Sequence, residues 1–104
     1  MSAKAKNEKI RYLLLHLPGP MWKAGVDFRE QPGIQDHVQH FQRLLEAGKL
    51  ERGGPFIGGA LGAMMMPIAE MDKEELARFA DEDPAVQSGL LTYEIWTWLV
   101  EMQS

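Results

Sequence analysis

The spacing of hydrophobic residues along the chain predicts six secondary-structure elements in the order β-α-β-β-α-β. Short stretches dense in apolar and aromatic residues are typical of strands, and four are present, at residues 10–17, 50–57, 61–69 and 90–100. A further stretch, at residues 34–47, repeats its apolar residues at helical spacing, and a capping pattern predicts a second helix from about residue 72 to 82. This order predicts a ferredoxin-like α+β fold, with an antiparallel sheet and both helices on one face.

Proline and glycine mark the turns between these elements. Pro18-Gly19-Pro20 ends the first strand, and Gly58-Gly59 predicts a tight hairpin turn between the second and third strands. Residues 18–33 are rich in proline and glycine and predict a long irregular loop, a kind of segment that often carries function. Because this loop contains Trp22 and Phe28, we expect it to pack as a lid over a cavity entrance.

Two aspartates mark helix starts. Asp72, with Glu75 three positions later, has the pattern of a capping box at the start of the second helix. Asp83 directly precedes Pro84, which disfavours α conformation in the residue before it, so the second helix should end near residue 82. Asp83 is then a suitable N-cap for a short helical turn with Pro84 at its first position.

The predicted strands are apolar on both faces. In the last strand, Tyr93 and Ile95 lie on one face while Trp96 and Trp98 lie on the other, and the first and third strands show the same double pattern. A sheet face that meets water should instead alternate with polar residues. Since a large exposed apolar patch is unusual on a monomer, we expect a second copy of the chain to cover this face in a two-fold homodimer.

Composition and charge narrow the class of protein. The 104 residues, 45% of them hydrophobic, suit one folded domain at residues 10–104, which we expect to follow a flexible lead at residues 1–9. The net charge of -4, from 15 acidic and 11 basic residues without a basic stripe, argues against nucleic acid as a partner. The chain has no cysteine and no apolar run of the roughly 20 residues that span a membrane, so we expect a cytoplasmic protein without a membrane partner.

Three ordered motifs lie along the chain between Ile10 and Leu99. They are His37-x-x-x-Phe41-x-x-Leu44-x-x-x-Gly48-x-Leu50, then Gly54-Pro55-Phe56, then Asp83-Pro84-x-Val86-x-x-Gly89-Leu90, followed by a Trp-rich strand. Together they resemble the YciI-like (YCII-related) family. The resemblance implies a dimeric α+β barrel, in which two ferredoxin-like sheets face each other, and a small cavity with a conserved histidine and aspartate. On motif position these are His37 and Asp83.

The family resemblance says less about the substrate. Relatives include a dehydrochlorinase that acts on a hydroxylated aromatic compound, but most have no known substrate. The chain departs from the shorter members in its long loop at residues 18–33, and it has Ala85 where an aromatic residue often follows the Asp-Pro pair. A shared substrate therefore does not follow from the resemblance.

The first helix carries two histidines, and its apolar stripe distinguishes them. At 100° per residue, the stripe is centred roughly 55° from His37 and about 110° or more from His40; it consists of Ile34, Val38, Phe41, Leu44 and Leu45. We therefore expect His37 to border the buried face and His40 to lie on the polar flank. An imidazole beside a cavity can exchange a proton near neutral pH, and a carboxylate on its other nitrogen fixes the tautomer. The alternative is a half-buried histidine with a purely structural hydrogen bond.

Asp83 also has two interpretations, since helix capping alone would explain an aspartate before a proline. The roles of cap and histidine partner are compatible, because a carboxylate has two oxygens. Asp36, His37 and His40 share a helix flank, but no third strong ligand lies near them in sequence, so we expect no metal. We also expect no cofactor.

Further residues are expected to line the cavity and bind a substrate: Tyr12, His16, Trp22, Pro55, Phe56 and Met65. His16 shares a strand face with Tyr12, although a hydrogen-bonded core histidine would have the same pattern. Trp22 could hold the loop down or cover the cavity. Met65 belongs to a run of three methionines that suits either flexible core packing or an adaptable cavity wall.

These observations favour a cofactor-independent enzyme in which His37, oriented by Asp83, acts as general acid or base on a small organic molecule. The expected chemistry is of the lyase, isomerase or hydrolase type on a hydroxylated or carbonyl-bearing compound. No motif for a nucleophilic serine or cysteine is present. The alternatives are a non-catalytic module that binds a small ligand or a protein and, less well supported, a cofactorless oxygenase.

Overall fold

The computed structural model describes residues 9–58 and 62–104. Within these ranges the chain forms four strands, β1 (Ile10–Pro18), β2 (Leu50–Pro55), β3 (Ala63–Pro67) and β4 (Leu91–Leu99). The helices are α1 (Ile34–Glu46), α2 (Lys73–Asp81) and α3 (Pro84–Gln87), with a short 3-10 turn, η1 (Phe28–Glu30), before α1. The predicted lead at residues 1–9, apart from its last residue, lies outside the described residues. So does Gly59 of the predicted hairpin turn.

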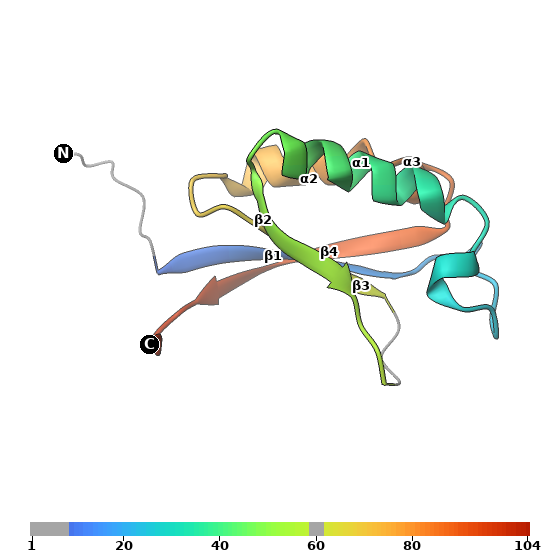
Figure 1. Cartoon of the computed structure of the whole chain (residues 1–104), viewed down its shortest axis with the longest axis horizontal. Helices are drawn as coiled ribbons and strands as arrows, with labels where there is room; N and C mark the ends of the chain where they lie inside the picture. Colours follow the sequence, from blue (N-terminus) through green and yellow to red (C-terminus); the bar gives the residue numbers. More distant parts are fainter. Residues whose placement is uncertain (1–8, 59–61) are drawn as a thin grey trace.

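The strands form one antiparallel sheet in the order β2-β3-β1-β4. The helices lie together on one face of this sheet (Figure 1). Leu14 in the central strand β1 pairs with Met65 of β3 on one side and with Ile95 of β4 on the other. This arrangement confirms the predicted ferredoxin-like α+β fold, and the predicted element order is correct throughout.

The helix-covered face carries the main hydrophobic core. Leu14 and Leu76 are both 0% exposed, and burying a leucine side chain contributes about 1.5–3 kcal/mol. The other buried members are Phe41, Leu44, Met65, Met71 and Ala80. Asp72 caps α2 by accepting a hydrogen bond from the backbone N–H of Glu75, as the capping pattern predicts.

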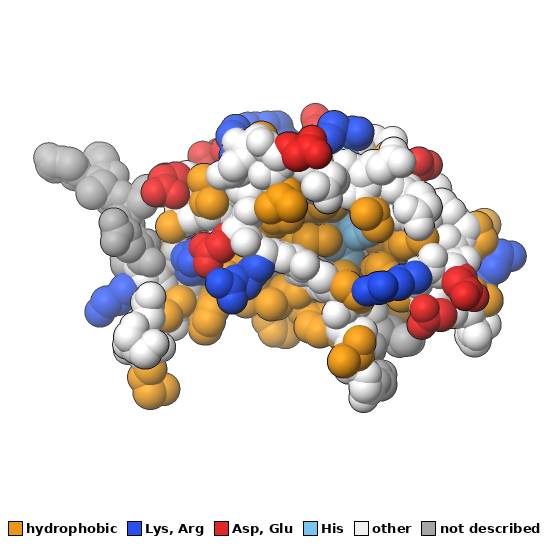
Figure 2. Space-filling model, viewed as in Figure 1, with side chains coloured by type: hydrophobic (Ala, Val, Ile, Leu, Met, Phe, Trp, Pro, Cys, Tyr) orange, Lys and Arg blue, Asp and Glu red, His pale blue; other side chains and the backbone are white. Residues whose placement is uncertain are grey.

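The opposite face of the sheet is also apolar, and none of the described helices covers it. In this single chain Trp96 is 54% exposed and Trp98 46%, and Figure 2 shows hydrophobic side chains along the underside of the sheet. The strand register places Leu13 opposite Trp96 and Leu15 opposite Met64 on this face. The prediction that the strands are apolar on both faces is therefore confirmed.

The orientation of α1 differs from the prediction. Val38 is 46% exposed and Leu45 45%, although both were assigned to the buried stripe, whereas His40, assigned to the polar flank, is only 5% exposed. The cause is α2, because His40 stacks on Phe79 of that helix with ring centroids 3.9 Å apart. The buried stripe is thus shifted toward α2, and Val38 and Leu45 face an open cavity.

The loop between β1 and α1 is held in place by a buried side chain. Gln31 is 2% exposed and exchanges hydrogen bonds with both backbone groups of Lys23, and it donates a further one to the carbonyl of Val26. At its start, Gly19 passes so close to Gly89 that a Cβ would lie 2.3 Å from the Gly89 carbonyl oxygen. The segment is therefore packed against the rest of the domain. Among the described residues, no helix has the length and apolarity needed to cross a membrane.

Candidate active site

A cavity of about 420 Å³ lies between α1 and the edge of the sheet formed by β2 and β3. Figure 2 shows the hollow below the helix layer, with histidine visible inside it. Its walls are mainly apolar, from Phe28, Ile34, Val38, Phe41, Leu45, Leu50, Pro55, Ala63 and Met65. The side chains of Arg29, Gln35, His37 and Gln42 supply polar groups. A mainly apolar pocket with a few polar groups is typical of a small-molecule site.

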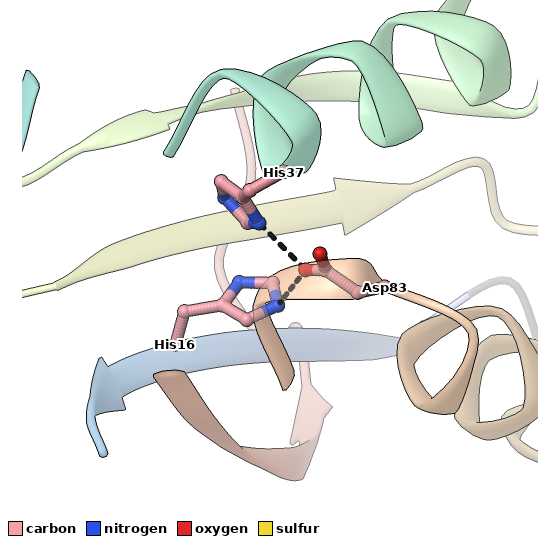
Figure 3. A group of neighbouring side chains, drawn as sticks. All are labelled: His16, His37 and Asp83. Atoms are coloured by element: carbon pink, nitrogen blue, oxygen red, sulfur yellow. Dashed lines mark hydrogen bonds and ion pairs between the residues drawn. The ribbon is translucent and has the colours of Figure 1, made fainter. Parts of the chain in front are cut away.

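His37 and Asp83 meet at the back of this cavity. Nδ1 of His37 lies 2.6 Å from Oδ2 of Asp83, and the two side chains are 2% and 0% exposed (Figure 3). Asp83 Oδ1 accepts a hydrogen bond of 2.9 Å from the backbone N–H of Ala85. The carboxylate therefore caps α3 with one oxygen and contacts the histidine with the other.

The fold brings these two residues together from distant parts of the sequence. His37 lies in the first turns of α1, while Asp83 lies between α2 and α3 with Pro84 following it as the first residue of α3. Because all three helices lie on one sheet face, the start of α1 approaches the α2–α3 junction (Figure 1). The short α3 fixes the backbone of Asp83, and the cap fixes its carboxylate.

His16 completes a cluster of three buried side chains. It projects from β1 and is 0% exposed, with Nε2 3.7 Å from the same Asp83 Oδ2 that contacts His37. The rings of His16 and His37 lie edge-on, with centroids 4.7 Å apart. Within the described residues, both nitrogens of His16 and Nε2 of His37 lack hydrogen-bond partners. His16 is therefore not the hydrogen-bonded core histidine considered as an alternative.

Burial and the neighbouring charges set the protonation of the cluster. Burial, followed by the positive charge of His37, lowers the pKa of His16 to about 3, against the opposing attraction of Asp83. Burial alone would raise the pKa of Asp83, but the His37 hydrogen bond and charge, with the Ala85 N–H, hold it below its usual value. At neutral pH, Asp83 is a carboxylate and His16 is neutral.

These charges also determine which nitrogen of His37 carries the hydrogen. A carboxylate only accepts hydrogen bonds, so His37 Nδ1 must be the donor. In the neutral imidazole, Nε2 then carries the lone pair. His37 can therefore act as a base through the nitrogen that has no partner in the described structure.

The same cluster is the set of described residues that could hold a metal ion. One ligand atom each from His16, His37 and Asp83 lie within 4.8 Å of one another. However, a metal-bound histidine normally donates its other N–H to a second group, and neither nitrogen of His16 has such a partner among the described residues, while the partner of His37 is Asp83, itself one of the three ligands. Asp36, His37 and His40, which share a helix flank in the sequence, do not form a metal site, since His40 bonds to the Phe79 carbonyl oxygen at 2.7 Å and Asp36 is exposed.

The other predicted site residues fall into two groups. Pro55 and Met65 line the cavity. Tyr12, Trp22 and Phe56 are not among its lining residues: Tyr12 packs at the margin of the main core, and Trp22 packs on Phe28 with ring centroids 5.8 Å apart. Trp22 thus holds the loop, while Phe28 and the adjacent Arg29 form the part of the loop that meets the cavity.

Sequence reasoning missed the polar residues on this side of α1. Gln35 and Gln42 line the cavity together with Val38 and Leu45, and these four positions follow helical spacing. Arg29, in η1, was also missed. The helical spacing of Gln35, Val38, Gln42 and Leu45 is a signal that could have identified this side of α1. No pattern in the sequence places Arg29 beside them.

The fold and the site define an α+β protein with the fold of dimeric α+β barrel subunits and a buried His-Asp pair at the back of a cavity. No family model and no curated protein matches this sequence. Among solved structures, the chain is similar to 5-chloro-2-hydroxyhydroquinone dehydrochlorinase (TftG) from Burkholderia phenoliruptrix, in complex with 2,5-dihydroxybenzoquinone. The TM-score is 0.55 at 21% identity, over 84% of this chain and 92% of the other. At this identity the likeness shows the fold alone.

Proposed function

We propose that this protein is a cofactor-independent enzyme of the YciI-like family that transfers a proton between His37 and a small organic molecule in the cavity. The observation that carries the proposal is the His37 Nδ1–Asp83 Oδ2 contact of 2.6 Å, combined with an unpartnered Nε2 on a residue that lines the cavity. When Nε2 takes a proton from the substrate, the imidazole becomes a cation. Asp83 then stabilises this charge and keeps the ring in position.

The cavity walls indicate the class of substrate. Their apolar and aromatic side chains favour a compact ring or other unsaturated carbon skeleton, and His37 requires an acidic hydrogen, from a hydroxyl or from carbon beside a carbonyl. Arg29, Gln35 and Gln42 offer hydrogen bonds to further oxygens. Lyase, isomerase or hydrolase chemistry fits these groups. The structurally similar dehydrochlorinase acts on a hydroxylated ring compound, which supports the proposal.

Turnover measurements test this function. Hydroxylated aromatic compounds and lactones should be assayed with the wild-type protein, with His37→Gln, and with His40→Gln as a matched control on the same helix. We expect the loss of the base to lower turnover by about 10²–10⁴-fold, while the His40 variant stays near wild type. Equal turnover in His37→Gln would reject the role of His37. Ligands that raise the unfolding temperature without being converted would favour the alternative, a non-catalytic binding module.

We further propose that the helix-free face of the sheet is buried in a homodimer. The support is the exposure of Trp96 and Trp98 beside Leu13, Leu15, Met64 and Met66 on a face without a helix. Light scattering at micromolar concentration should give the mass of a dimer, and Trp98→Glu should give a monomer. Met21→Glu, at an exposed position in the loop, is the control and should stay dimeric. A monomeric wild-type protein would contradict the proposal.

A further inference from the structure

Three imidazole nitrogens at and behind the wall of the cavity lack hydrogen-bond partners in the described part of the chain. They are both ring nitrogens of His16 and Nε2 of His37. The role proposed above for His37 uses only one of them. Buried polar groups in folded proteins are normally hydrogen-bonded, so a fully buried imidazole with two unpaired nitrogens needs a specific explanation.

Asp83 is the partner within reach of His16. Its Oδ2 already contacts His37 Nδ1 at 2.6 Å and lies 3.7 Å from His16 Nε2. Figure 3 marks both contacts with dashed lines. A shift of about 1 Å brings His16 to hydrogen-bond distance. We propose that His16 is a positioning residue that donates its Nε2–H to Asp83, so that one carboxylate holds two imidazoles and only His37 takes up the proton of the reaction. This inference rests on the proposed function, because it concerns the same proton transfer.

The two histidines are not equivalent in this arrangement. His37 lines the cavity, whereas His16 lies on β1 and does not line it, so of the two His37 is placed to meet a substrate. The groups facing His16 are His37 and, further away, His40 from α1, and Asp83 from the α2–α3 junction. Burial and the His37 charge oppose a second cation there. His16 therefore stays neutral, with one N–H and one lone pair.

The donated hydrogen bond would change what Asp83 can do. Oδ1 already accepts from the Ala85 N–H, and Oδ2 would accept from both imidazoles. A carboxylate stabilised by three donors is a weak proton acceptor. The proton that His37 takes from a substrate then stays on the imidazole, where it can be returned to the product through Nε2.

Nitrogen NMR of the histidine side chains tests this inference on the wild-type protein, without a substrate. We expect His16 to give the pattern of a neutral ring with the hydrogen on Nε2 at every pH from 8 to 4. A hydrogen on Nδ1, or a His16 ring that becomes charged near neutral pH, would overturn the proposal. Addition of one equivalent of zinc chloride separates the metal alternative: tight binding that shifts both rings would also overturn it.

Two variants separate positioning from packing. His16→Gln places an amide N–H near the position of Nε2, whereas His16→Leu fills a similar volume without a donor. We expect the Gln variant to preserve the wild-type His37 spectrum and the Leu variant to change it. If both leave the His37 spectrum unchanged, His16 only fills space and the proposal fails; if the Leu variant does not fold, the wild-type spectrum decides. These readouts do not depend on turnover, so they can fail while the role of His37 stands, and the reverse also holds.

Discussion

Helix α1 carries two buried histidines, three residues apart, in opposite chemical situations. His40 is hydrogen-bonded through Nε2 to the Phe79 carbonyl oxygen at 2.7 Å and stacks on the ring of the same residue. His37 bonds to Asp83 through one nitrogen, while its other nitrogen lacks a partner in the described structure, on a residue that lines a cavity. Both histidines are at most 5% exposed, so burial alone does not distinguish them.

The difference between them teaches where to look for chemistry in a small domain. The His40 contacts join α1 to α2, and they account for its burial within the protein itself. No described group near His37 forms a hydrogen bond with Nε2. An unpaired buried nitrogen beside a cavity is more readily explained by a ligand or a proton transfer than by packing. Whether each ring nitrogen has a hydrogen-bond partner, and not how deeply the histidine is buried, therefore indicates which histidine carries chemistry.

Replacement of Asp83 should have the largest effect. Asp83→Asn removes the charge that holds His37 but keeps an oxygen that can cap α3, so we expect turnover to fall by about 10²–10⁴-fold in a protein that remains folded. The titration of His37 followed by NMR should shift at the same time. Asp72→Asn is the matched control, because Asp72 caps α2 and has no histidine partner among the contacts of the described structure. If His37 titrates identically in wild type and Asp83→Asn, Asp83 is only a cap.

The fold was predictable because short-range patterns determine most of it. Stretches dense in apolar residues predicted the strands, Asp72 and Asp83 marked the starts of α2 and α3, and the doubly apolar strands predicted the uncovered sheet face. His37 and Asp83 were predicted as a pair only through the family resemblance. The two residues are 46 positions apart, and nothing in the local sequence around either of them predicts that they are in contact.

The orientation of α1 and the state of His16 could not be predicted in the same way. The stripe of α1 was placed by apolar residues alone, but a histidine that stacks on an aromatic ring and bonds to a carbonyl packs as a core residue, and this contact depends on where α2 lies. For His16 the strand pattern gave the correct face but not the neighbours across the layer. Contacts between elements, which no periodicity encodes, decided both cases.

The pH dependence of stability tests the same distinction with a smaller effect. An imidazole in the unfolded chain has a pKa of 6.5, whereas burial and the His37 charge lower the pKa of His16 to about 3 in the folded protein. Between these values the unfolded state binds the extra proton, so the contribution of His16 to stability is fully present above pH 6.5 and is lost as the pH falls toward 3.

The expected slope of the unfolding free energy is about 1.4 kcal/mol for each pH unit. Asp83 acts mainly at lower pH than the range from 6 to 4, because its pKa is lowered from 3.8 and the stability that it contributes is lost as the pH falls below that value. Urea unfolding at fixed protein concentration from pH 6 to 4 should therefore give a shallower slope for His16→Gln than for wild type by this amount, since glutamine takes up no proton. Equal slopes would mean that His16 accepts a proton in the folded protein.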